Sequence, residues 1–204
     1  MTSASTKPAL TPALVGLFAF ACGVIVANLY YGQPIIALIA PDVGLSDHAA
    51  SLIVSLTQIG YGLGLLFITP LADLLENRKL ILILLGASLI SLVLAATAQN
   101  GAVFLIVSLL IGLTTVSTQV LIPLAAHMAD DATRGRVVGN IMGGLILGIL
   151  LSRPLSGLIA DHFDWRASFG FAAGLMAVMA GLLRLGNTLM RGGARLFSLP
   201  PSPA

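Results

Sequence analysis

The chain of 204 residues is 57% hydrophobic and 9% charged, with a mean hydropathy of +1.02, whereas soluble domains contain about 25% charged residues. This composition leaves too few polar side chains to cover a water-facing surface and indicates an integral membrane protein. The net charge of +2 lacks the clustered lysines and arginines of a nucleic-acid-binding surface, and the single cysteine, Cys22, excludes an internal disulfide, a redox pair and a multi-cysteine metal site.

Six apolar segments are long enough to cross a bilayer, since a spanning helix needs roughly 20 mostly apolar residues. They are continuous and lack the alternation of barrel strands, so the predicted fold class is an all-α membrane protein with six transmembrane helices. One bundle, residues 14–185, is predicted between a tail of residues 1–13 and a Pro-rich tail of residues 186–204 that is expected to be disordered. The predicted spans are residues 14–38, 50–71, 80–98, 102–125, 137–160 and 167–185.

Basic residues fall almost entirely on one side of these spans. Eight lysines and arginines lie on that side, whereas the opposite loops contain Arg166 alone. Because loops rich in lysine and arginine stay in the cytoplasm, both termini are predicted to be cytoplasmic in a multi-pass protein of the cell inner membrane.

Polar side chains inside the predicted spans are the best guide to function, because such groups are costly in hydrocarbon. Asn28 and Tyr31 are three residues apart and are predicted to share a helix face, as are Gln58 and Tyr61. A solute-binding cavity explains these residues, and so do hydrogen bonds between helices or, for Tyr31, an interfacial position. The cavity candidates are Asn28, Tyr31, Gln33, Gln58, Tyr61, Thr118, Gln119 and Arg153.

Arg153 is the one charge placed well within a predicted span, and Pro154 follows it. A guanidinium in this position is expected to face the bundle interior or a water-filled cavity, where a carboxylate, carbonyl groups or an anionic solute pairs with it. The alternative is that the side chain extends to the membrane surface, which is about eight residues or roughly 12 Å away along the helix. We favour the functional interpretation.

Small residues recur at every fourth position of the fifth predicted span. This spacing lets helix backbones approach closely in lipid. One face of the span is therefore expected to pack very closely against another helix. The residues concerned are Gly144, Gly148, Ser152 and Ser156.

The search for catalytic and metal-binding groups yields no candidate. The eight carboxylates and three histidines map to loops or span ends, without HExxH spacing, and there is no phosphate-binding loop. The chain is therefore predicted not to be an enzyme and to use no metal or cofactor. Trp165 is expected to be an interfacial anchor.

Several segments resemble landmarks of the major facilitator superfamily. The segment Thr69-Pro-Leu-Ala-Asp73-Leu-Leu-Glu-Asn-Arg78-Lys79 resembles the family's cytoplasmic signature, Gly60-Tyr-Gly-Leu-Gly64 fits its second helix, and Arg134-Gly-Arg136 and residues 157–166 are similar to its next landmarks. The match runs in register over residues 14–185. The chain therefore resembles an N-terminal six-helix half from an efflux-like bacterial branch of this family.

This resemblance implies a secondary transporter that moves a small solute by alternating access between two six-helix halves. It places the first and fourth helices on the central cavity. It also implies a cytoplasmic gate, in which Asp73 caps a helix of the partner half and Arg78 pairs with Asp130 or Asp131. The gate candidates are Asp73, Arg78, Asp130, Asp131 and Arg134.

The sequence departs from the family pattern at three places and in its length. Leu74, Glu76 and Asn77 weaken the charge pattern of the gate, and Ser108 stands where many proton-coupled members carry an arginine. Ser152-Arg153-Pro154 replaces a Gly-Pro motif of drug and proton antiporters, which argues against proton coupling in this half.

Since one half is present, we expect a truncated carrier. The alternatives are two copies that together rebuild a carrier and a remnant that does not transport. The expected partners are a solute, the bilayer and either a second copy or a missing C-terminal half, with no nucleic acid.

Overall fold

The structure is a computed structural model that describes residues 11–190, apart from the side chains of residues 73, 78 and 184–190. All of its regular secondary structure within this range is helical, which confirms the predicted all-α fold class. The last helix continues to Met190, and residues 191–204 of the predicted C-terminal tail lie outside the described range. The helices are α1 (Pro12–Ala27), η1 (Gln33–Ile35), α2 (Ile36–Asp42), α3 (Asp47–Phe67), α4 (Leu71–Leu74), α5 (Asn77–Ala96), α6 (Gly101–Thr115), α7 (Ser117–Met128), α8 (Arg134–His162) and α9 (Trp165–Met190).

Side-chain caps fix the starts of three helices. The hydroxyl of Thr11 accepts a hydrogen bond from the backbone at the start of α1, and the hydroxyl of Ser46 does the same for α3. The Asn100 side chain accepts from the Val103 amide at 2.9 Å at the start of α6. Each cap satisfies a backbone N–H that has no partner within the helix. The turn before α3 passes through Gly44 at φ +73°, a conformation that glycine adopts without steric cost.

The first predicted span, residues 14–38, is not one continuous helix. α1 ends at Ala27, turns occupy residues 28–32, and the chain continues through η1 into α2. Pro34 lies in this segment and lacks the N–H group that would continue an α-helix through it. Within the described residues, five helical segments are long and apolar enough to cross a membrane, and α1 is a shorter apolar helix.

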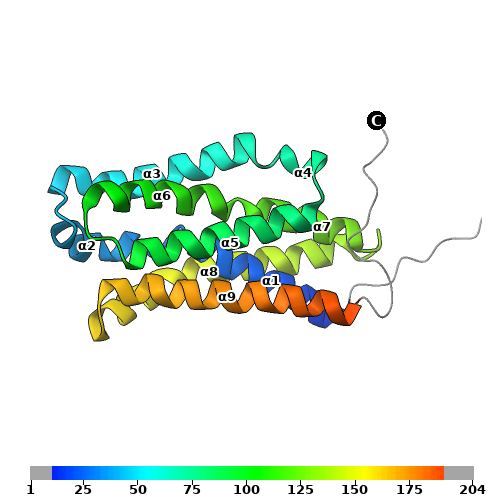
Figure 1. Ribbon diagram of the computed structural model, residues 1–204. Coiled ribbons are helices and arrows are strands. Elements are labelled where there is room, and N and C mark those ends of the chain that lie inside the picture. The colour runs from blue at the N-terminus through cyan, green and yellow to red at the C-terminus, as the bar shows by residue number, and fades with distance from the viewer. Residues whose placement is uncertain (1–10, 191–204) are drawn as a thin grey trace, which may run out of the picture.

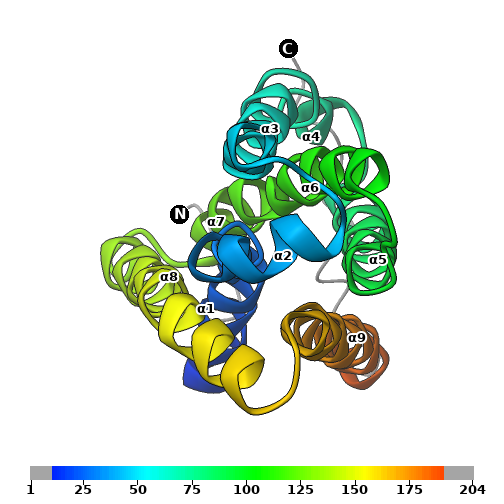
Figure 2. The same cartoon turned by 90° about the vertical axis from the view of Figure 1, so that its left-hand side faces the viewer.

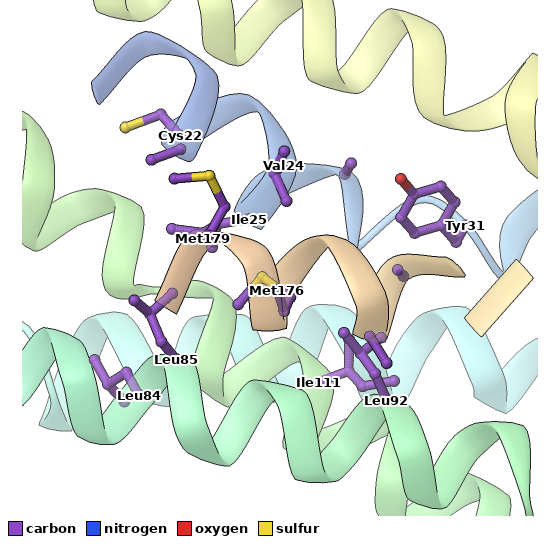
Figure 3. Close-up of a cluster of buried hydrophobic side chains, with 14 of the residues drawn as sticks. Cys22, Val24, Ile25, Tyr31, Leu84, Leu85, Leu92, Ile111, Met176 and Met179 are labelled. Atoms are coloured by element: carbon purple, nitrogen blue, oxygen red, sulfur yellow. The ribbon is translucent and has the colours of Figure 1, made fainter. Parts of the chain in front are cut away.

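The long helices lie side by side and form a bundle (Figure 1). α3 packs on α6, α1 on α8, and α5 on α9, and the view along the bundle shows α1 between α8 and α9 (Figure 2). A cluster of apolar side chains from α1, α5 and α9 fills the interior (Figure 3). Its fully buried members include Ile25, Leu85, Met176 and Met179.

Glycines bring two of these helix pairs into backbone contact. A Cβ added to Gly23 of α1 would lie 2.6 Å from the Gly144 carbonyl oxygen of α8, and Gly148 also meets the Gly23 backbone. Gly60 of α3 and Gly112 of α6 likewise lie against the backbone of the opposite helix, so that an added Cβ would clash there. The close approach expected for the fifth predicted span is therefore confirmed, and it fixes the position of α8 relative to the break after α1.

Candidate functional site

The side chain of Arg153 on α8 reaches back to the segment that follows α1. Its Nη2 atom donates a hydrogen bond to Gln33 Oε1 at 3.0 Å, and its guanidinium carbon lies 5.5 Å from the ring centroid of Tyr30. Both partners are neutral, and no described carboxylate forms an ion pair with Arg153. The guanidinium is exposed on the surface of the bundle. The arrangement therefore orients a positive charge without neutralising it.

A second pair of candidates connects α3 with α7. Gln119 Nε2 donates to the Tyr61 hydroxyl at 2.8 Å, and both side chains are partly buried. Gln58, which was expected to share a face with Tyr61, is exposed. The buried hydroxyl nearby belongs instead to Thr57, which donates to its own helix at Ile53 O. This pair joins the second and fourth membrane-spanning segments at a polar contact.

Asn28 lies inside the bundle rather than on its surface. It is 3% exposed, and its Nδ2 atom donates to Ser88 Oγ at 3.5 Å, while its Oδ1 atom has no hydrogen-bond partner among the described residues. Asn28, Gln33, Thr57 and Ser108 line a cavity of about 20 Å³. This volume accommodates a single small group, so the cavity does not enclose a whole solute.

Tyr31 and Thr118 are both buried in helix packing. The Tyr31 side chain is 2% exposed, and its carbonyl oxygen accepts a hydrogen bond from Ser156 Oγ at 2.6 Å. Because the helix ends before Asn28, Asn28 and Tyr31 do not share a helix face as expected. The Thr118 hydroxyl donates to the Thr115 carbonyl at 3.1 Å. The structure therefore brings Arg153 together with Gln33, and Tyr61 with Gln119, whereas the hydrogen bonds of Tyr31 and Thr118 go to other partners.

Three of the five gate candidates, Asp130, Asp131 and Arg134, lie at the connection between α7 and α8. Arg134 forms an ion pair with Asp131 at 2.6 Å and donates from Nε to the Ala126 carbonyl at 3.2 Å. The Asp130 side chain is exposed. The side chains of Asp73 and Arg78 lie outside the described residues, so the pairing of Arg78 with Asp130 or Asp131 stays a prediction.

At the other end of the bundle, a charged cluster joins three segments that are far apart in the sequence. Asp42, at the end of α2, accepts hydrogen bonds from Arg166 Nη1 and, at 3.0 Å, from the indole nitrogen of Trp165. Arg166 Nη2 also donates to the Ala98 carbonyl at 3.2 Å. The bond from Arg166, followed by that from Trp165, holds the pKa of the Asp42 carboxyl below its usual value. Sequence analysis missed this cluster, because nothing local in the chain connects Asp42 with Arg166.

The expectation that Trp165 is an interfacial anchor is wrong. Its side chain is 3% exposed and packs edge-on against Phe104 and Phe169, with ring centroids 5.6 and 6.1 Å away. An indole can be buried in this way when its N–H group finds a partner, and Asp42 is that partner. Trp165 therefore helps to hold the start of α9 against α6.

A family model described as Major Facilitator Superfamily matches residues 8–193. The chain is 42% identical over 193 residues to the "Uncharacterized transporter YgaY" of Escherichia coli O157:H7, a match that covers 94% of this chain and 49% of the relative. It is 28% identical to a "Probable sugar efflux transporter" of Helicobacter acinonychis, over 92% of this chain and 49% of that relative.

The "Inner membrane transport protein YnfM" of Escherichia coli K12 is 27% identical over 77% of this chain and 38% of the relative. The chain therefore spans about half the length, or less, of the curated relatives that it matches.

Proposed function

Because the chain belongs to the major facilitator superfamily, and is thus a multi-pass membrane protein of a transporter family, we propose that it forms a six-helix half of a carrier that moves a small organic anion by alternating access. The observation that carries this proposal is the un-neutralised guanidinium of Arg153 in the membrane-spanning part of α8. The resemblance implies no enzymatic role and no cofactor.

The energetics of Arg153 support an anionic solute. An arginine at the centre of a membrane costs about 2.5–3.5 kcal/mol on insertion scales, so such residues face a cavity or a partner rather than lipid. The amide of Gln33 and the ring of Tyr30 hold the guanidinium but leave its charge available. A guanidinium binds carboxylate or phosphate through two parallel, charge-assisted hydrogen bonds, and a neutral sugar lacks the negative charge that strengthens them.

The other candidates enter this proposal in supporting roles. The Tyr61–Gln119 pair and the exposed Gln58 supply further polar groups, and the buried Asn28, Tyr31 and Thr118 support the helices from which the solute-binding surface is built. A second six-helix half, from a longer chain or a second copy, would enclose this surface. The pair of Arg134 with Asp131, together with Asp73, Arg78 and Asp130, would form the gate on the cytoplasmic side, where both termini are proposed to lie.

Solute-dependent thermal unfolding of the purified full chain tests this proposal. The screen compares organic mono- and dicarboxylates and sugar phosphates with neutral sugars at constant ionic strength. We expect at least one anion to raise the unfolding midpoint. Arg153→Gln should weaken its binding by about tenfold or more, because a charge-assisted hydrogen bond is lost, and Arg153→Lys should keep part of the affinity.

Lys79→Gln is the matched control, since it removes an exposed positive charge whose partner is Glu76 in the same helix turn. Its anion binding should equal that of the wild-type chain. Stabilisation by neutral sugars alone would contradict the proposal and would favour the substrate class named for the Helicobacter relative. Undiminished anion binding by Arg153→Gln would also contradict it.

A further inference from the structure

A small cavity lies beside the break that follows α1, and we call it the Asn28 cavity. Its volume is about 20 Å³, and its lining comes from the segment after α1 and from α3, α6 and α9. Gly32 and Gln33 are half-buried and lie at its mouth. Its inner wall carries the buried polar side chains of Asn28, Thr57 and Ser108. The volume is close to that of a single water molecule or hydroxyl group.

Gln33 connects this cavity to Arg153. Its Oε1 atom accepts the hydrogen bond from Arg153 Nη2 at 3.0 Å, and the same side chain lines the cavity. One glutamine side chain therefore separates the guanidinium from the cavity. A linear solute whose carboxylate binds Arg153 can extend past Gln33 and place its other end in the cavity.

The described side chains of the inner wall offer hydrogen-bond acceptors and no free donor. Asn28 is 3% exposed, its Nδ2 atom donates to Ser88 Oγ, and its Oδ1 atom has no partner among the described residues. The hydroxyls of Thr57 and Ser108 donate to carbonyl groups of their own helices at 2.7 and 2.8 Å, so their oxygens can only accept a further bond. The inner wall therefore complements a group that donates a hydrogen bond and disfavours a carboxylate or a phosphate.

Charge decides which donor suits the cavity. No aspartate or glutamate lines it within the described part of the chain, and the nearby charge on Arg153 is positive. An ammonium group would lose its water in the cavity without gaining a counter-ion, which is costly in a protein interior. A hydroxyl group carries no charge and can donate its single hydrogen to Asn28 Oδ1. The cavity therefore favours a hydroxyl group over an ammonium group.

We propose that the Asn28 cavity binds the hydroxyl group of a hydroxycarboxylate whose carboxylate binds Arg153. This assignment rests on the proposed function, because Arg153 must bind an organic anion, and it names the class of that anion. A hydroxyl group that displaces water from the cavity restores a hydrogen bond to Asn28 Oδ1, whereas a methyl group leaves this buried acceptor unpaired. Hydroxycarboxylates should therefore bind more tightly than acids of the same length that end in a methyl group.

Binding titrations of the purified full chain with straight-chain carboxylic acids test this proposal. The acids increase in chain length, and at each length the far end carries a hydroxyl, methyl, ammonium or second carboxylate group. We expect one chain length to fit both Arg153 and the cavity. At that length the hydroxyl compound should bind about tenfold more tightly than the other compounds, as expected when a buried acceptor gains its partner.

A matched pair of serine variants tests whether the cavity is responsible. The hydroxyls of Ser108 and Ser91 are both in side chains that are 3% exposed, and both donate to a carbonyl of their own helix at 2.8 Å, but Ser91 does not line the cavity. Ser108→Ala should reduce the preference for the hydroxyl compound, and Ser91→Ala should behave as the wild type. Asn28→Leu should bind the hydroxyl and methyl compounds equally. If Asn28→Leu does not fold, the serine pair decides.

The outcomes separate this proposal from the proposed function. Equal binding of the hydroxyl and methyl compounds at every chain length, or tighter binding of the ammonium or second carboxylate compound, would overturn this proposal and leave anion binding at Arg153 intact. A hydroxyl preference that is unchanged in folded Asn28→Leu, or reduced equally in Ser108→Ala and Ser91→Ala, would also overturn it. Failure of every acid to bind would overturn the proposed function as well.

Discussion

Replacing Gly144 with leucine is expected to separate α1 from α8 and to lower the free energy of unfolding by about 3 kcal/mol, the upper end of the usual cost of overpacking. A Cβ at this position would lie 2.7 Å from the Ala19 carbonyl carbon and 2.8 Å from its Cβ. The obstructing atoms are mainly backbone, so a side-chain rotation cannot relieve the clash. The helices must move apart, and the contact between α1 and α8 is lost.

The adjacent glycine provides the control for this substitution. A Cβ added to Gly143 meets no atom within 4 Å, so Gly143→Leu should leave stability unchanged or slightly higher, since leucine favours helix more than glycine. Unfolding can be followed by labelling Cys22, the single cysteine, which is fully buried in α1. Equal labelling curves for the two variants would show that the close contact of α1 with α8 does not exist.

Trp165→Ala is expected to cost about 3–5 kcal/mol, the usual range for truncating a large buried aromatic side chain. The ring is 3% exposed and contacts Phe104 and Phe169 edge-on. Its removal also takes from Asp42 the hydrogen bond of the indole nitrogen. The substitution therefore opens a cavity and weakens the connection between α2, α6 and α9.

Two further variants separate these contributions in a thermal or chemical unfolding experiment. Trp165→Phe retains a ring but loses the bond to Asp42, so its stability should lie between those of the wild type and Trp165→Ala. Phe163→Ala, two residues earlier, removes a side chain that is 80% exposed and should change little. A loss in Phe163→Ala as large as that in Trp165→Ala would contradict the buried position of Trp165.

The fold class and the tight contact of α8 could be predicted because both depend on local patterns. Hydropathy over about 20 residues identifies spanning segments, and small residues four apart mark a helix face on which backbones approach closely. The spacing of Gly144 and Gly148 therefore predicts which face of α8 packs closely, although it does not show which helix packs there. The interruption after Ala27 was missed, because residues 28–38 remain apolar enough to extend a hydropathy segment although Pro34 restricts the backbone.

Contacts between distant residues could not be predicted in the same way. Gln33 and Arg153 were both cavity candidates, but they are 120 residues apart, and their hydrogen bond depends on how α8 packs on α1. Asp42 and Arg166 are 124 residues apart and lie in what appeared to be ordinary loops. A single sequence shows which polar residues are unusual, whereas the packing of the helices determines which of them meet.

The central claim is that the surface around Arg153 faces water and solute rather than lipid. Ile146 lies two helical turns before Arg153 on the same face of α8 and is 59% exposed. The adjacent Leu147 is 55% exposed and lines an apolar hollow between α1 and α8. Each of the two residues is replaced by cysteine in a Cys22→Ala background. The protein in membranes is then treated with a charged, membrane-impermeant thiol reagent. Labelling reports exposure to water, because the reactive thiolate forms in water.

The account predicts rapid labelling at position 146, slowed by a bound anion, and little labelling at position 147. Equal and slow labelling at both positions would place the Arg153 surface in lipid and contradict the account.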